Sequence, residues 1–140
     1  MGASKLRSGI TAAAWAAILL SSALALASEA RYEGAVLTDT KGGETNKETF
    51  SPDTRKIFLY VYVVDVPNGV KLTGTWIVEK AAGITPNSPI AASDIITRPQ
   101  MKTATFSLDK PNGGWPPGDY RVELAIDGKL QFTARFKVVP

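Results

Sequence analysis

The sequence contains no histidine and no cysteine, so the side chains that carry most protein chemistry are missing. Imidazole acid–base catalysis, thiol nucleophiles, disulfides and Cys/His zinc sites are therefore excluded. No serine stands in a nucleophile elbow, and the short glycine loops Gly42-Gly43 and Gly113-Gly114 lack the helix that a phosphate site requires. We predict that the protein is not an enzyme and holds no cofactor or metal, with a histidine-free hydrolase as the remote alternative.

Carboxylates are the next candidates, because a pair of them could hydrolyse a glycosidic bond without histidine. Most of the aspartates stand at expected strand ends or turns, where this residue accepts local backbone hydrogen bonds: Asp65, Asp94, Asp109, Asp119 and Asp127. A calcium site needs several converging oxygen ligands, whereas Asp39, Glu44 and Asp53 stand singly. The carboxylates therefore indicate turns rather than catalysis or metal binding.

Three aromatic residues form a candidate ligand or partner surface. Tyr60 and Tyr62 share one face of an expected strand, with Phe58 beside them, and Trp115 lies in a loop of prolines and glycines. Exposed aromatic rings on a β-sandwich can stack on sugar rings, which would make this surface a carbohydrate-binding site. The alternative is that Trp115 packs over the neighbouring corner and the two tyrosines only fill the sheet surface.

Composition and charge favour one soluble globular domain without a nucleic-acid partner. The 140 residues are 44% apolar and 21% charged, which is close to the average for soluble domains. Taking Lys5 and Arg7, in a segment that we expect to be removed, from the formal charge of +3 leaves only +1. The one basic row, on an outer strand face, is interrupted by a glutamate and is typical of a solvated surface: Arg121, Glu123, Lys129, Arg135 and Lys137.

Residues 1–27 have the pattern of a secretory signal peptide. A basic start is followed by the uncharged run 10–27, which closes with Ala25-Leu26-Ala27. Small residues such as Ala25 and Ala27, third and first before the cut, are typical of signal-peptide cleavage sites. We expect the cut after Ala27, or alternatively after Ala30, and therefore a periplasmic or extracellular location for the exported protein. Retention of the segment as a membrane anchor is the alternative; otherwise the chain meets the membrane only transiently.

The remaining residues, 28–140, are expected to form one all-β domain. Residues 56–66 are apolar on both faces and are rich in β-formers, which favours a central strand. Residues 71–79, 103–108, 120–126 and 130–138 alternate with the period of two that half-buried strands show. Asp127-Gly128 predicts a two-residue hairpin turn. Six or seven such strands favour two antiparallel sheets packed face to face, with Leu130 and every second residue after it pointing inward.

The order of these elements resembles a bacterial, exported, cysteine-free immunoglobulin-like β-sandwich. Trp76 lies in the middle of the strand that follows the long central one, and Tyr120 opens a late strand after Pro116-Pro117-Gly118-Asp119. The resemblance implies that Trp76 packs in the core and that Tyr120 forms a tyrosine corner. Val122 then stands where antibody domains place a cysteine. The resemblance implies a fold but no single function.

Residues 80–101 match this pattern least, with three prolines and no clean alternation. One interpretation is a short edge strand around residues 95–97, with Pro99 preventing unwanted pairing. The other is a loop that binds a partner. We therefore predict a non-catalytic binding or assembly module that binds another protein of the cell envelope or surface, as an accessory subunit of an envelope or filament complex. The alternative is a carbohydrate-binding module.

Overall fold

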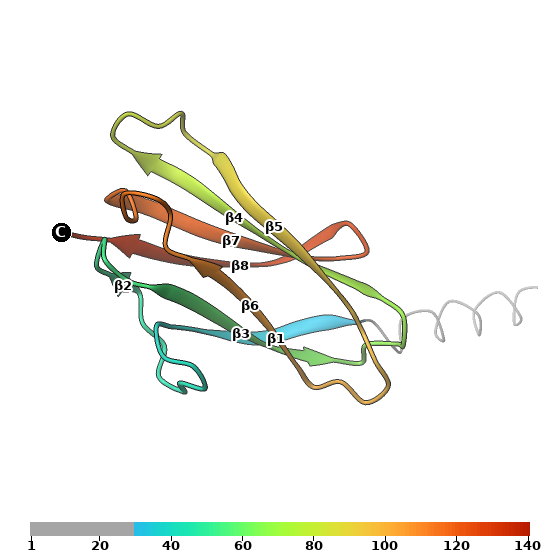
Figure 1. Ribbon diagram of the computed structural model, residues 1–140. Coiled ribbons are helices and arrows are strands. Elements are labelled where there is room, and N and C mark those ends of the chain that lie inside the picture. Colours follow the sequence, from blue (N-terminus) through green and yellow to red (C-terminus); the bar gives the residue numbers. More distant parts are fainter. Residues whose placement is uncertain (1–29) are drawn as a thin grey trace, which may run out of the picture.

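The computed structural model describes residues 30–140, which fold into two β-sheets packed face to face (Figure 1). The expected signal peptide, 1–27, lies outside the described residues. This described part contains eight strands: β1 (Arg31–Thr38), β2 (Thr49–Phe50), β3 (Lys56–Val64), β4 (Lys71–Ala81), β5 (Ser88–Ile96), β6 (Thr103–Asp109), β7 (Gly118–Ile126) and β8 (Lys129–Val138). Within residues 30–140 there is no helix of the length and hydropathy that crossing a membrane would take.

The strands divide into a three-stranded sheet, β1-β3-β6, and a five-stranded sheet, β2-β8-β7-β4-β5. All pairs are antiparallel except β2 and β8, which run parallel. The N-terminal part of the domain thus contributes β1 to one sheet and β2 to the other. The all-β class and the two packed sheets confirm the prediction, whereas the short strand β2, which pairs in parallel with β8, was not expected.

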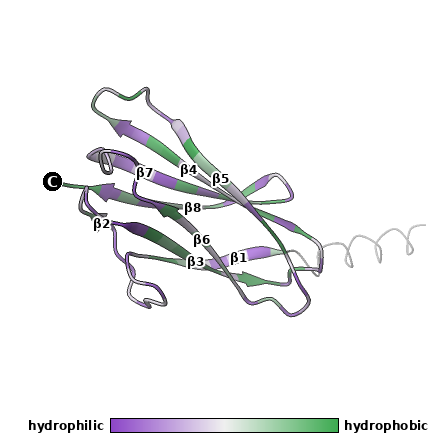
Figure 2. Cartoon of the chain, viewed as in Figure 1, coloured by the Kyte–Doolittle hydropathy of each residue, from purple (hydrophilic) through white to green (hydrophobic). Residues whose placement is uncertain are grey.

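Alternation along the strands builds the core between the sheets. In β3, Ile57, Leu59 and Val61 are fully buried, while Tyr60 and Tyr62 point to the outer face. β7 shows the same pattern, with four inward residues buried: Tyr120, Val122, Leu124 and Ile126. The colours of Figure 2 change along the strands accordingly. Burial of these apolar side chains is the main driving force for the fold.

The inward orientation expected for Leu130 was wrong, because its side chain is 58% exposed. The register between β7 and β8 shifts at this point: Leu124 pairs with Phe132, but Ala125 already pairs with Leu130. The extra residue, Gln131, reverses the facing of the residues before it, as a β-bulge does. Leu130 therefore lies on the outer face, opposite the outward Ala125.

Of the two interpretations of segment 80–101, the edge strand is confirmed, because β5 is the last strand of its sheet, but its nine residues extend further back than the expected 95–97. β5 pairs with β4 along most of its length, with a bulge between Trp76 and Ile77 of β4 that leaves Ile90 as the extra residue of β5. This bulge and the small residues of β5 hide the alternation in the sequence. Pro99 lies beyond the end of the strand and does not block its edge.

The two residues that carry the immunoglobulin-like resemblance lie in the core. Trp76 points inward from β4 and is 2% exposed. Tyr120 begins the inward row of β7, its ring stacks on Phe136 with centroids 5.0 Å apart, and its hydroxyl donates a hydrogen bond to the Pro116 carbonyl at 2.5 Å. This backbone contact a few residues upstream is the geometry of a tyrosine corner.

We expect Tyr120→Phe to lower the free energy of unfolding by about 1–3 kcal/mol, because the half-buried Pro116 carbonyl would lose its partner. Tyr62→Phe is the control: its ring is 45% exposed, so removing its hydroxyl should change stability by less than about 0.5 kcal/mol. Urea unfolding of both variants makes the comparison. A loss for Tyr120→Phe as small as that expected for Tyr62→Phe would mean that the corner hydrogen bond does not stabilise the fold.

Two buried tyrosines should make the fold sensitive to alkaline pH. Burial raises the pKa of Tyr32 and of Tyr120 from 10.0 to about 12, and the Tyr32 hydroxyl donates to the Ala125 carbonyl at 2.9 Å across the two sheets. Since the unfolded chain ionises these phenols first, their contribution to stability is complete below pH 10 and is lost as the pH rises towards 12. Urea unfolding between pH 8 and 11.5 should show this loss. Tyr32→Phe should reduce its slope, and an unchanged slope would contradict the assignment.

Candidate functional site

Trp115, proposed above as a surface aromatic, is buried at 1% exposure, so its assignment to a ligand surface was wrong. The loop before β7 folds back on residues 52–54, where the Trp115 backbone N–H donates to the Pro52 carbonyl at 2.9 Å. Its indole Nε1 donates to the Thr54 carbonyl at 2.8 Å, and its ring contacts Tyr120 edge-on at 5.9 Å. Trp115 closes one end of the core and cannot stack on a ligand.

Tyr60 is half-buried on the outer face of β3. Its ring stacks on Phe58 with centroids 5.9 Å apart, and its hydroxyl accepts a 2.6 Å hydrogen bond from the Gly42 backbone N–H. Gly42 belongs to the loop between β1 and β2, where Lys47 donates to Asp39 at 2.7 Å and that hydrogen bond lowers the pKa of the Asp39 carboxyl. The Tyr60 hydroxyl thus already accepts a hydrogen bond from this loop, and its own proton stays free to be donated.

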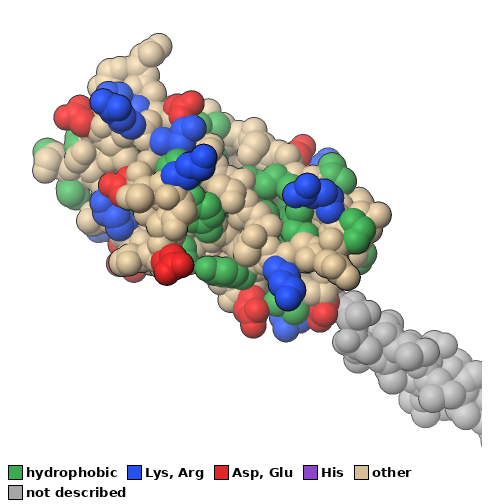
Figure 3. All heavy atoms as spheres, turned by 60° about the horizontal axis from the view of Figure 1, so that its bottom comes forward, with side chains coloured by type: hydrophobic (Ala, Val, Ile, Leu, Met, Phe, Trp, Pro, Cys, Tyr) green, Lys and Arg blue, Asp and Glu red, His purple; other side chains and the backbone are tan. Residues whose placement is uncertain are grey.

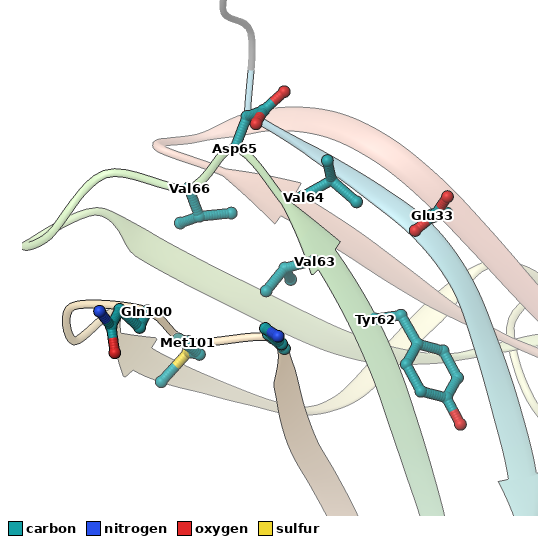
Figure 4. Close-up of a pocket in the computed structure, with 9 residues that line it drawn as sticks. Glu33, Tyr62, Val63, Val64, Asp65, Val66, Gln100 and Met101 are labelled. Atoms are coloured by element: carbon teal, nitrogen blue, oxygen red, sulfur yellow. The ribbon is translucent and has the colours of Figure 1, made fainter.

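Tyr62 is the one exposed aromatic side chain among residues 30–140, and a hollow of about 920 Å³ lies beside it. Figure 4 shows Glu33 and Tyr62 on one side of the end of β3, with Gln100 and Met101 on the other. Lys102 adds an ammonium group to the lining. In the space-filling view, hydrophobic side chains form an interrupted band across a face that also carries both kinds of charge (Figure 3).

The backbone around this hollow is irregular at three points. Glu33 is the extra residue of a bulge in β1, between Tyr32 and Gly34. Asp65 and Gln100 have positive φ, 54° and 62°, which is uncommon outside glycine and recurs at functional sites. The Asp65 carboxylate is 3.4 Å from Arg31. One ring face with a carboxylate, an amide and an ammonium nearby can bind a polar ligand, but a hollow so open to water does not favour acid–base catalysis.

The five aspartates singled out in the sequence are engaged one by one in local contacts instead of gathering at one site. Asp127 follows the expected hairpin geometry, with φ at 47°, and accepts from the Lys71 backbone N–H at 3.0 Å. Each of the others contacts a different partner. Asp65 lies beside Arg31 and Asp94 beside Thr73, while Asp109 lies beside Lys56 and Asp119 beside Lys137. No group of three carboxylates that could hold a metal ion occurs in the described part of the chain.

The basic row on the outer face of the five-stranded sheet is paired with carboxylates. Arg121 lies 2.9 Å from Glu123 and 3.5 Å from Glu79, and Arg135 lies 3.1 Å from Glu79. Arg121 also donates to Asn87 at 2.8 Å. These contacts neutralise much of the positive charge that nucleic-acid binding would require.

One motif that sequence reasoning missed is Ser107-Leu108-Asp109-Lys110, which has the Ser-x-x-Lys spacing of some serine nucleophiles. In the structure Ser107 pairs with Phe58 on the outer face of β6. Residues three apart on a strand point to opposite faces, and the Lys110 backbone N–H is bonded to the Arg55 carbonyl just beyond the strand. The motif therefore does not bring an amine to the hydroxyl.

β5 is the last strand of the five-stranded sheet, and the hydrogen bonds at its end show which of its backbone groups face outward. The Thr97 N–H donates to the Val70 carbonyl at 2.9 Å, while the Asp127 N–H donates to Lys71 at 2.8 Å on the other side of β4. Because bonding alternates along an antiparallel pair, Val70 and every second residue after it bond towards β5. Residues 91, 93 and 95 are therefore bonded to β4, and the N–H and C=O groups of Ala92, Asp94 and Ile96 face the free edge.

Most of this edge lacks the features by which proteins prevent strand pairing, namely lysines, prolines and bulges. Pro89 and the bulge at Ile90 lie near the start of β5, leaving residues 91–96 without them. The one charged side chain of the strand, Asp94, accepts a 2.7 Å hydrogen bond from Thr73. Ile96 is 58% exposed at the far end. Sequence reasoning missed this surface because the strand itself was not predicted in full.

An apolar groove of about 290 Å³ lies beside the first half of β5, between β5 and β6. Its lining comes from both sheets and from the loops that join them: Val78, Ile84, Ile90, Leu108, Asp109, Pro111, Pro116 and Tyr120. Ile90 is 42% exposed. Ser93 pairs with the inward Gly74, yet it is exposed, so the gap next to β5 is not filled by side chains of residues 30–140.

Comparisons with known proteins show the fold. No protein-family model and no curated protein matches the chain. Among solved structures it is similar to an immunoglobulin-like protein of Pseudomonas aeruginosa, with 13% identity and a TM-score of 0.57, over 81% of this chain and 99% of that one. It is also similar to the alkylpurine DNA glycosylase of Pseudomonas fluorescens bound to DNA containing an abasic site analog (12% identity, TM-score 0.51, 81% of this chain). A third similar structure is a β-glucosidase of Erythrobacter marinus, with 14% identity and a TM-score of 0.50 over 79% of this chain.

The chain spans 31% of that glycosylase and 15% of that glucosidase. At these identities the similarities establish an immunoglobulin-like β-sandwich and carry no activity from those enzymes to this chain.

Proposed function

We propose that this chain is an exported, non-catalytic assembly module that binds a partner protein of the cell envelope along the free edge of β5. The observation that carries the proposal is the stretch 91–96, in which the outward N–H and C=O groups are neither bonded within residues 30–140 nor guarded by lysine or proline. Such an edge is a template for another chain.

Two observations support a non-catalytic role. The whole sequence lacks histidine and cysteine, and aspartates such as Asp94 and Asp109 each contact a separate partner instead of one another. Export rests on the basic start, the apolar run and the Ala25-Leu26-Ala27 site. The intact mass of protein recovered from the periplasm or medium should correspond to a chain that begins at Ser28 or Arg31. A full-length, membrane-bound product would contradict export.

The binding surface can be tested in living cells with a photo-crosslinking phenylalanine analogue at Ile96, on the free edge of β5. The same analogue at Gln131, exposed on β8, is the control. We expect an adduct of one defined mass at position 96 and none at position 131. The adduct should disappear in a variant that also carries Ala92→Pro, which removes an outward N–H without removing a bond to β4. Absence of an adduct at position 96 would contradict the proposal.

The carbohydrate-binding alternative now depends chiefly on Tyr62, since Trp115 is buried and the Tyr60 ring is half-buried and stacked on Phe58. The observation that favours it is the exposed ring beside Glu33, Gln100 and Lys102. A glycan array with the mature protein tests it directly. Under this alternative, Tyr62→Ala abolishes binding to an array sugar and Tyr62→Phe retains it; binding that survives Tyr62→Ala would exclude this surface.

A further inference from the structure

We propose that the segment bound at β5 is an extended strand whose alternate, apolar side chains enter the groove between β5 and β6. This inference rests on the proposed function and adds the chemistry of the partner. It joins the free edge of β5, the last strand of the five-stranded sheet (Figure 1), to the apolar groove that Ile90 of β5 helps to line.

The hydrogen-bonding groups set the length and the register of the added strand. Ala92, Asp94 and Ile96 offer three outward N–H and three outward C=O groups, and the bulge at Ile90 interrupts the pattern on one side. On the other side Thr97 is 2% exposed and bonds the turn before β4, since its hydroxyl donates to the Pro67 carbonyl at 2.6 Å. The edge therefore suits a strand of about six residues.

The pleat then decides where the side chains of that strand point. A strand paired with β5 continues the five-stranded sheet, so every second side chain points into the space between the sheets. Next to β5 this space is bordered by the small side chains of Ala91 and Ser93, and Ser93 is exposed although it faces inward. Side chains of an incoming strand thus find room at these positions.

The groove selects apolar side chains. All its lining residues except Asp109 are apolar or aromatic, and Asp109 is 3.2 Å from Lys56. A volume of about 290 Å³ is at the lower limit of small-molecule pockets, roughly 300 Å³, and has room for one or two aliphatic side chains. Main-chain bonds along β5 would supply affinity, and the groove would supply specificity.

The opposite face of the added strand would lie beside the outward side chains of β5. Ala92 is small, and Asp94 carries the one charge, with one oxygen engaged by Thr73. A lysine or arginine across from Asp94 would be a favourable cross-strand pair. The partner segment is therefore apolar on its inward positions and polar, with a basic residue, on its outward ones.

A displayed library of random seven-residue peptides, selected on the wild-type chain, tests this inference. The enriched peptides should alternate apolar and polar residues. Their affinity should fall about tenfold or more with Ala92→Pro, which removes an outward hydrogen bond, and with Ile90→Glu, which places a charge in the groove. Ala92→Val, which keeps the outward N–H and changes a side chain at the same position, should bind within about twofold of wild type.

Enrichment without alternation, or affinities that do not respond to Ala92→Pro and Ile90→Glu, would overturn the inference. If the peptides failed in this way while the adduct at position 96 formed and still disappeared with Ala92→Pro, a partner would still pair with the edge of β5, and the proposed function would stand. Absence of the adduct at position 96 as well would contradict both the inference and the proposed function. Purified wild-type chain that self-associates through β5 would show instead that the occupant is a second copy.

Discussion

Replacing Trp76 by alanine is expected to lower the free energy of unfolding by about 3–5 kcal/mol, the usual range for deleting a buried aromatic side chain. Trp76 is 2% exposed and contacts the ring of Phe136 edge-on at 6.2 Å, so the change leaves a cavity between the sheets. Trp76→Phe should cost less, because it refills part of that space. Urea unfolding measures both variants against wild type.

Tyr62→Ala is the matched control for Trp76→Ala. It also removes an aromatic ring from the middle of a sheet, but from the outer face and at 45% exposure, so the loss should stay below about 1 kcal/mol. A loss below about 1 kcal/mol for Trp76→Ala itself would mean that Trp76 lies on the outer face of β4 and not in the core.

Gly118→Ala should lower the free energy of unfolding by about 2–6 kcal/mol, which combines roughly 1–3 kcal/mol for backbone strain with roughly 1–3 kcal/mol for overpacking. Gly118 begins β7 with φ at 156°, and a Cβ there would lie 2.2 Å from the Lys80 carbonyl oxygen and 2.8 Å from the Ala81 Cβ. Both obstacles belong to the partner strand β4, so β7 would have to move away from it. Thermal or urea unfolding measures the loss.

Gly128→Ala provides the control for this substitution. Gly128 also has positive φ, 83°, but a Cβ there would meet nothing within 4 Å, so only the backbone strain of about 1–2 kcal/mol is expected. If the two glycine variants lost equal stability, the close approach of β7 to β4 would not be a constraint on this fold.

Local patterns predicted most of the sandwich, because a strand with one buried face has a period of two. The inward rows of β3 and β7 and the Asp127-Gly128 hairpin follow directly from the residues. Where a bulge inserts one residue, the period is broken and the prediction failed. The extra residue Gln131 places Leu130 on the outer face instead of the inner one. The extra residue Ile90 interrupts the alternation by which β5 could have been predicted.

The candidate surfaces were harder to predict, since they depend on contacts between distant parts of the chain. Trp115 is buried by a loop that bonds to Pro52 and Thr54, about sixty residues earlier. Tyr60 is engaged by Gly42, and Tyr62 stays exposed on the same strand. The free edge of β5 follows from its position as the last strand of the sheet, which no local pattern records.

Amide hydrogen exchange across β5, measured residue by residue with and without a selected peptide, tests whether a bound segment pairs with the free edge of this strand. In the free protein, Ala91, Ser93 and Ile95 should exchange slowly, because they are bonded to β4, while Ala92, Asp94 and Ile96 exchange quickly. With the peptide bound, the second group should become protected and the first should change little. If Ala92, Asp94 and Ile96 stay unprotected while protection appears around Tyr62 and Gln100, the ligand binds the outer face of the three-stranded sheet and the edge proposal is wrong.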